Sequence, residues 1–143
     1  MIVSQPREVL WAFINKRVGT PFSEDFRAIG AVIGGCLCAV VAYNGFTGRT
    51  CFMHSAIDDP TAINRTFVKA IFAYPFLQCG RTHVLALVDS ANLQALDINK
   101  RCGFREVLRL EGSGLEGQDL ILLQMTRNEC RWINGKEKHA AFS

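Results

Sequence analysis

The spacing of hydrophobic residues in the first part of the chain predicts one helix followed by three strands. In residues 8–17 four apolar side chains fall on one helical face: Val9, Leu10, Phe13 and Ile14. The apolar stretches that follow predict strands at 26–33, 37–43 and 50–57. The turn signals that separate these strands are Gly34-Gly35 and Asn44-Gly45.

The second part of the chain predicts two more helices and three more strands. Residues 61–78 carry four apolar side chains at helical spacing, with Thr61 or Asn64 as the N-cap and Pro75 ending or kinking the helix. The continuous apolar run at 83–88 is typical of a fully buried strand. A short amphipathic helix within 91–104 follows, and the last predicted strands are 106–110 and 120–125.

Two details of the short helix are also predicted. Asp89-Ser90 is expected to cap it, and three apolar side chains are expected to face inward: Leu93, Leu96 and Ile98. Taken together, the elements predict an α/β (α+β) chain around a mixed sheet that is mostly antiparallel and flanked by helices. A strand–helix–strand crossover follows the antiparallel first half.

Composition fits one soluble domain. The chain has 143 residues, of which 49% are hydrophobic and 20% charged. We therefore expect a single domain at 1–127 and a polar tail at 128–143. Trp132, which lies in this tail, could dock on a partner. The net charge is only +3 and the sequence has no dense Lys/Arg stripe, which argues against a nucleic-acid partner. Glycines interrupt the longest uncharged run, 28–48, and no signal peptide is recognised, so no membrane partner and a cytoplasmic location are predicted.

The six cysteines do not have the spacing of a metal site. None forms a C-x-x-C pair, and most lie in apolar surroundings. We therefore expect reduced, structural thiols and no metal.

The stretch from residue 83 to residue 104 carries a family resemblance. The strand "HVLALVD" is followed by Asn92, by Ala95 and by "NKRCGF", and a late Asp119 opens the apolar strand "DLILLQM". This pattern resembles the GCN5-related N-acetyltransferase (GNAT) family, in which the corresponding helix often reads N-x-x-A-x-x-L-Y-x-x-x-G-F. The order of elements agrees with that family from about residue 26 to residue 127. The resemblance implies the acyl-CoA N-acyltransferase (GNAT-like) fold.

The resemblance also implies a donor, a reaction and a set of binding residues. Members of the family transfer an acetyl group from acetyl-CoA directly to an amine, with the donor in a wedge between two splayed strands. Carried onto this chain, the pantetheine arm would contact Ala56 and Ile57, and residues 59–65, with Ala62, Asn64 and Arg65, would hold the pyrophosphate at a helix N-terminus. Asn92 would line the other side of the donor.

Two positions depart from the family pattern. The family's glycine-rich pyrophosphate loop is replaced by "DPTAINR", and there is no glycine between residues 55 and 79. Asp58 and Asp59 also bring negative charge to this segment, which Arg65 and Lys69 partly offset. Asn99 stands where many members have a tyrosine general acid. An amide can donate a hydrogen bond to a thiolate but cannot supply its proton.

His54 is the candidate catalytic base. It lies on the strand that often carries this role in the family, and an imidazole titrates in the useful range. The alternative is a partly buried histidine that is hydrogen-bonded to a neighbour. Ser55 points to the opposite face of the strand and is expected in the core.

Three functions remain open at this point. The first is an N-acetyltransferase that binds acetyl-CoA and an unidentified amine in a ternary complex. The second is a catalytically inactive binding or assembly module, since small degenerate members encoded by bacteriophages look similar. The third is a sensor of acyl-CoA. Open sheet edges leave a homodimer or another protein partner possible in each case.

Overall fold

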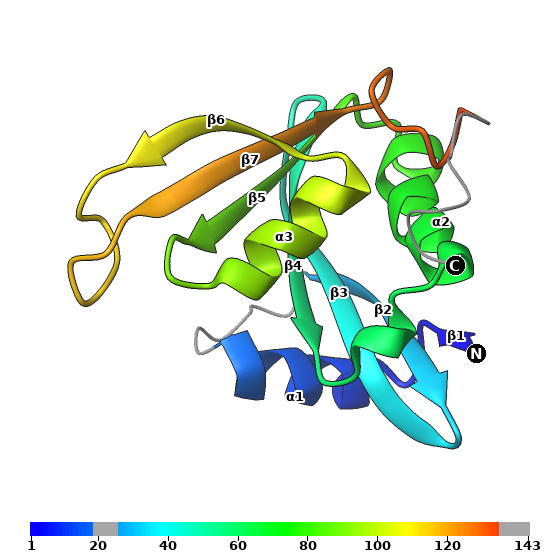
Figure 1. The fold of residues 1–143 in the computed structure, drawn as a ribbon. Helices are drawn as coiled ribbons and strands as arrows, with labels where there is room; N and C mark the ends of the chain where they lie inside the picture. The colour runs from blue at the N-terminus through cyan, green and yellow to red at the C-terminus, as the bar shows by residue number, and fades with distance from the viewer. Residues whose placement is uncertain (19–25, 135–143) are drawn as a thin grey trace.

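The computed structural model describes residues 1–18 and 26–134, and these residues form one seven-stranded sheet with helices on both faces (Figure 1). The sheet order is β1-β2-β3-β4-β5-β7-β6, and every neighbouring pair is antiparallel except β4 and β5, which are parallel. The elements, in chain order, are β1 (Ile2–Val3), α1 (Arg7–Val18), β2 (Arg27–Ile33), β3 (Cys36–Thr47), β4 (Thr50–Ile57), the 3₁₀ turn η1 (Pro60–Ala62), α2 (Arg65–Ala73), the π-helical turn η2 (Tyr74–Gln78), β5 (His83–Asp89), α3 (Leu93–Cys102), β6 (Arg105–Leu110) and β7 (Leu120–Thr126). The predicted fold class is confirmed.

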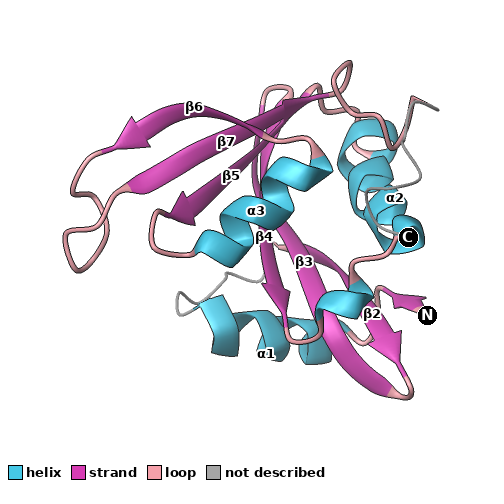
Figure 2. Cartoon of the chain, viewed as in Figure 1, coloured by secondary structure: helices cyan, strands magenta, loops and turns pink. Residues whose placement is uncertain are grey.

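Strand alternation divides the core between the two faces of the sheet, which the helices cover (Figure 2). The smaller cluster lies under α1: Leu10, Phe13, Ile14, Phe26, Val40, Ala42 and Ala56. The larger cluster joins the opposite face of the same strands to α2 and α3, and its largest fully buried members include Tyr43, Phe67, Phe72 and Phe76. Burial of these apolar side chains is the main favourable contribution to folding.

Side-chain caps fix where α2 and α3 begin. The Asn64 side-chain oxygen accepts from the Phe67 N–H at 2.9 Å, as predicted for one of two candidate caps. For α3 the cap is Asn92, whose oxygen accepts from the Ala95 N–H at 3.1 Å. The prediction of Asp89-Ser90 as the cap was wrong, because Asp89 accepts from the Ala91 N–H one turn earlier. Leu93 is consequently the first helical residue and is 72% exposed, not inward-facing.

Two other boundaries differ from the prediction. β3 continues through Asn44-Gly45 to Thr47, and the turn lies at Gly48. Gly45 has a φ of +62° at a point where the β3–β4 register shifts, so this glycine accommodates a bulge inside the strand pair. The helix predicted at 61–78 is divided into η1, α2 and η2. Pro75 ends the α-helical ladder, and the Cys79 N–H closes the wider turn on the Tyr74 carbonyl.

Residues just beyond 127 pack on the domain. Cys130 and Trp132 are buried in the larger core cluster, and the Trp132 indole N–H donates to the Cys102 carbonyl at 2.7 Å. This bond satisfies a carbonyl at the end of α3, where helix carbonyls lack partners within the helix. All six cysteines are free thiols. Among the described residues, no helix has the length and apolar character to cross a membrane.

The packing of Trp132 generates a stability prediction. Trp132→Phe should lower the free energy of unfolding by about 1–2 kcal/mol, because the Cys102 carbonyl loses its buried donor. Trp132→Ala should cost about 3–5 kcal/mol through the additional cavity. Urea denaturation followed by circular dichroism measures both changes. Leu115→Ala, at a fully exposed position between β6 and β7, is the control and should change stability by less than about 0.5 kcal/mol.

Candidate functional site

The strands β4 and β5 pair over only a short distance and then separate. Their register contains three residue pairs, Thr50↔His83, Cys51↔Val84 and Phe52↔Leu85. β4 nevertheless runs on to Ile57 and β5 to Asp89, and Figure 1 shows the two strands diverging toward their ends. The second half of β4 therefore stays paired with β3 on one side and, among the described residues, borders a wedge without a paired strand on the β5 side.

The backbone of β4 turns hydrogen-bonding groups toward this wedge. The Asp58 N–H donates to the Cys38 carbonyl of β3 at 2.8 Å, and in an antiparallel pair such contacts recur at every second residue. Ala56 therefore directs its backbone groups to β3, whereas Ser55 and Ile57 direct theirs into the wedge. Polar backbone groups in this position need a partner, which a ligand can supply.

Two adjoining cavities occupy the wedge, with volumes of about 370 and 200 Å³. Five residues line both: Arg17, Ser55, Asn92, Ala95 and Asn99. His54 borders the larger cavity, and Ala56 and Ile57 border the smaller one. Ser55, expected in the core, is exposed to the wedge instead, because the strand beside it is missing.

Three of the predicted site residues lie away from both cavities. Ala62 is fully buried in the larger core cluster, and Asn64 caps α2. Neither these two residues nor Arg65 is among the residues that line the wedge. The structure thus brings together residues of two elements that are distant in the sequence: His54, Ala56 and Ile57 of β4, and Asn92 and Asn99 of α3.

His54 is half-buried and is held by a side chain of β3. Its Nε2 lies 2.8 Å from the Asn44 Oδ1 atom. Because an amide oxygen can only accept, Nε2 carries the proton and Nδ1 is the basic nitrogen of the neutral ring. Burial lowers the pKa of His54 below its usual value of 6.5, so the ring is neutral at pH 7. The imidazole is therefore a hydrogen-bonded histidine, as the alternative expected, and it borders the cavity as well.

The two asparagines of α3 already use part of their hydrogen-bonding capacity. Asn99 is 7% exposed, and its Nδ2 donates to the Ala95 carbonyl at 2.8 Å. The Asn92 oxygen accepts from the Ala95 N–H, which leaves its amide NH₂ group for other contacts. Asn99 therefore stabilises the inner face of α3 and has no ionisable proton to donate.

The segment after β4 satisfies its own backbone donors. The N–H groups of Asp58 and Asp59 donate to the Cys38 carbonyl, and Pro60 has no N–H. The Thr61 N–H donates to the Asp59 carboxylate at 3.0 Å, and the next two N–H groups donate to the carbonyls of Asp59 and Pro60. A carboxylate of this chain thus caps the first turn of the segment that the resemblance assigns to the pyrophosphate, and the hydrogen bonds from Thr61 lower the pKa of Asp59.

Sequence reasoning missed an ion pair at the mouth of the wedge. The Arg17 guanidinium donates two hydrogen bonds to the Asp58 carboxylate, at 2.7 and 2.6 Å, and it also lies over the Phe13 ring. Arg17 lines both cavities. No local spacing signals this pair, because its two members come from α1 and from the end of β4.

Comparisons with known proteins identify the fold. No protein-family model matches the sequence, and no curated protein matches it. Among solved structures, glutamate-to-glutamine mutant forms of the spermidine/spermine N-acetyltransferase SpeG from Vibrio cholerae superpose with a TM-score of 0.76 at 16% identity, covering 96% of this chain and 99% of that chain. SpeG from Vibrio cholerae in complex with manganese ions gives a TM-score of 0.74 at 15% identity, covering 96% of each chain. The chain has the acyl-CoA N-acyltransferase (GNAT) fold, and the wedge lies where the resemblance places the donor.

The environment of His54 predicts a dependence of stability on pH. Because burial lowers the folded-state pKa, the unfolded chain binds more protons between that pKa and 6.5, and stability falls as the pH is lowered through this window. NMR titration of the ring should give a midpoint below 6.5. His54→Gln should remove this part of the pH dependence, whereas His83→Gln should keep it. A midpoint at or above 6.5 would contradict the burial argument.

Proposed function

We propose that this chain is an N-acyltransferase, which moves an acetyl group from acetyl-CoA to an amine within the wedge between β4 and β5. One observation carries the proposal. The unpaired backbone groups of Ser55 and Ile57 face two adjoining cavities, both of which Asn92 lines and the larger of which His54 borders. The GNAT fold supports the reaction class.

The wedge fits the pantetheine part of the donor. A pantetheine arm carries two amides, and backbone groups of Ser55 and Ile57 can pair with them as a neighbouring strand would. The Asn92 amide and the apolar side chains of Ala95 and Ile98 form the opposite wall. Bound acetyl-CoA supplies a thioester carbonyl, to which the amine nitrogen forms its new bond while the carbon–sulfur bond breaks.

His54 accepts the proton that the acceptor nitrogen loses. Its Nδ1 atom is the basic position, and the lowered pKa keeps the ring unprotonated at neutral pH. Asn99 replaces the family's tyrosine and donates to Ala95, so protonation of the leaving thiolate falls to solvent. Most of the rate gain then comes from positioning the two substrates, as expected for a direct transfer.

The charges of the wedge bear on the acceptor. Among the described residues that line the two cavities, the charged side chains are Arg17, Asp58 and Asp89. Asp58 is paired with Arg17, and Asp89 accepts from Ala91 and from the Gln118 side chain at 2.6 Å. This wedge does not supply the carboxylates that a polycation needs. A single amine on an otherwise uncharged molecule suits it better.

Catalysis by His54 predicts a separation between binding and turnover. The protein should bind acetyl-CoA in isothermal titration calorimetry and acetylate at least one member of a panel of primary amines. His54→Gln should lower kcat by about 10²–10⁴-fold and leave the affinity for acetyl-CoA nearly unchanged. His83→Gln, at a histidine that lines neither cavity, is the matched control and should retain activity. Absence of binding at millimolar acetyl-CoA would refute the proposed donor.

The hydrogen bonds within the segment after β4 predict how the donor is recognised. Because the N–H groups at 58–63 are bonded within the chain and Asp59 adds a negative charge there, the nucleotide half of coenzyme A should add little affinity. Pantetheine should compete with acetyl-CoA at a Kd within about tenfold of that of coenzyme A, which corresponds to no more than about 1.4 kcal/mol. Asp59→Asn should strengthen coenzyme A binding and leave pantetheine unaffected. A preference for coenzyme A above about 100-fold would show that the pyrophosphate is bound after all.

A second candidate function is a non-catalytic binding or assembly module. It is favoured by the same segment, since the backbone donors at 58–63 are occupied within the chain. This alternative includes the interpretation of the chain as a degenerate, phage-related member, and it allows a homodimer. Failure to bind both acetyl-CoA and pantetheine would favour this module. Binding without turnover would favour an acyl-CoA sensor.

A further inference from the structure

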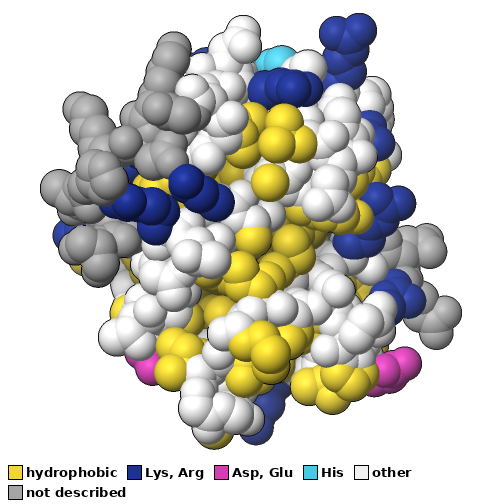
Figure 3. Space-filling view, turned by 90° about the vertical axis from the view of Figure 1, so that its right-hand side faces the viewer, with side chains coloured by type: hydrophobic (Ala, Val, Ile, Leu, Met, Phe, Trp, Pro, Cys, Tyr) yellow, Lys and Arg dark blue, Asp and Glu magenta, His cyan; other side chains and the backbone are white. Residues whose placement is uncertain are grey.

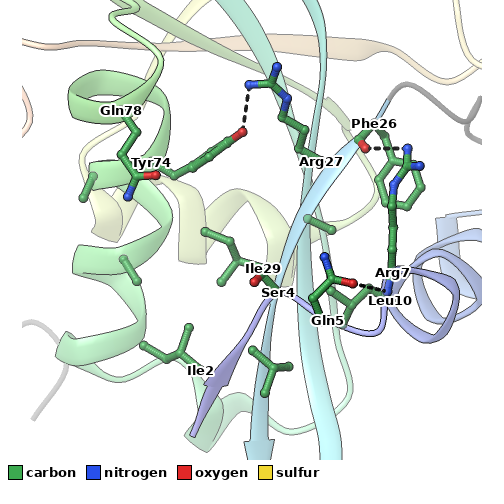
Figure 4. A pocket seen from close by; sticks show the side chains of 14 residues that line it. Ile2, Ser4, Gln5, Arg7, Leu10, Phe26, Arg27, Ile29, Tyr74 and Gln78 are labelled. Carbon is green, nitrogen blue, oxygen red and sulfur yellow. Dashed lines mark hydrogen bonds between the residues drawn. The ribbon is translucent and has the colours of Figure 1, made fainter.

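A larger cavity lies at one edge of the sheet, between β2, the N-terminal segment and α2 (Figure 4). Its volume is about 480 Å³, and it shares no lining residue with the wedge. In Figure 3, which faces this side of the molecule, hydrophobic side chains gather across the centre and Lys and Arg side chains lie around them. The site described below is independent of the proposed acyl transfer.

The cavity lies against a part of the sheet edge beside which the described residues place no strand. β1 pairs with β2 only through Ile2↔Ala31 and Val3↔Gly30, and the chain then turns away toward α1. Met1 and Val32 form a hydrogen-bonded pair, in which each N–H donates to the other residue's carbonyl. In β2 the backbone N–H and C=O groups that point away from β3 therefore belong to Val32 and to every second residue before it. Ala28 therefore directs its N–H and C=O outward, where β1 does not reach.

The floor of the cavity is apolar and is hollow because its side chains are small. Ile29 of β2 and two alanines of α2, Ala70 and Ala73, form part of it. Tyr74 and Gln78 continue the same side of the helix, at the rim that Figure 4 shows. An extended chain with apolar side chains could rest on this surface.

Two arginines border the cavity, and both are held by uncharged partners. Arg7 donates to the Phe26 carbonyl and Arg27 donates to the Tyr74 hydroxyl, each at 2.9 Å; Arg27 also lies 3.5 Å from the Cys79 sulfur. Other arginines of the described chain reach carboxylates: Arg17, Arg101, Arg105 and Arg109. Among the described residues that line the cavity there is no acidic side chain. Each guanidinium has five N–H donors, so both keep donors for a further acceptor.

We propose that this cavity binds a short, extended peptide that ends in a free carboxylate. The peptide backbone pairs with the exposed N–H and C=O of Ala28, as strand addition to an open sheet edge does. Its apolar side chains lie on Ile29, Ala70 and Ala73. Its carboxylate lies at the Phe26–Arg27 end of the edge and accepts hydrogen bonds from Arg7 and Arg27.

The three features together select this ligand over simpler ones. A small inorganic anion would use the arginines but would leave the apolar floor and the Ala28 backbone groups without a partner. A polycation would be repelled by the two guanidinium groups. Only a ligand that combines an extended backbone, an apolar body and a terminal carboxylate uses all of them.

The test uses the full chain and the probe peptide acetyl-Val-Leu-Val with a free C-terminus. NMR titration should shift the backbone amide of Ala28, and hydrogen exchange at that amide should slow on binding. The same peptide with a C-terminal amide should bind about tenfold more weakly or worse, because it loses its charge-assisted hydrogen bonds. Arg27→Gln should weaken the acid peptide and not the amide, and Arg27→Lys should restore part of the loss.

Controls separate the site from general charge effects. Arg101→Gln removes an arginine from α3, away from the cavity, and should leave peptide binding unchanged. Ala73→Leu fills the floor without changing charge and should abolish binding while circular dichroism shows a folded protein. The proposal is overturned if no binding occurs at several-fold molar excess in the millimolar range, if acid and amide peptides bind equally, or if inorganic phosphate competes fully without any response at Ala28.

Discussion

The short register between β4 and β5 is the constraint on which the rest of the site depends. After Phe52↔Leu85 the two parallel strands separate, so the backbone of β4 from Ser55 onward loses a neighbour on one side. A sheet that stayed paired would satisfy those groups and leave no cavity. The divergence instead places α3, which follows β5 directly, opposite β4. It also brings His54 to the border of the space between them.

In the described part of the chain, backbone donors and charges are arranged differently at the wedge in the middle of the sheet and at its β2 edge. After β4, Asp59 caps its own turn and Asp58 is paired with Arg17, so potential anion-binding groups are already occupied. At the β2 edge the opposite holds. Arg7 donates a hydrogen bond to a carbonyl and Arg27 donates one to a hydroxyl. These uncharged partners position the guanidinium groups without neutralising their charge. The fold thus offers a wedge suited to a largely neutral, amide-containing arm and an edge suited to a carboxylate.

Much of the fold was predictable because it depends on local patterns. Three strands and the first helix follow from hydrophobic spacing, and β4 was predicted with its observed bounds. Gly103 ends α3 with a φ of +119°, a left-handed backbone conformation that favours glycine. The errors came from competition between equally suitable groups. Asp89 and Asn92 are both good caps, and Gly45 signals either a turn or a bulge. The local sequence does not decide between such alternatives.

By itself, the sequence determined the order and type of most elements, the mixed sheet and the placement of His54, Ala56 and Ile57 on one strand, because each of these depends on neighbouring residues. Only the tertiary structure decided which of their atoms face the wedge. Strand pairing turns the backbone of Ser55 and Ile57 inward, and the Nε2 of His54 meets Asn44 from another strand. Contacts between residues far apart in the sequence also decided that Ala62 is buried and that Arg17 forms an ion pair with Asp58. Such contacts join residues far apart in the chain, so no pattern within a short window records them.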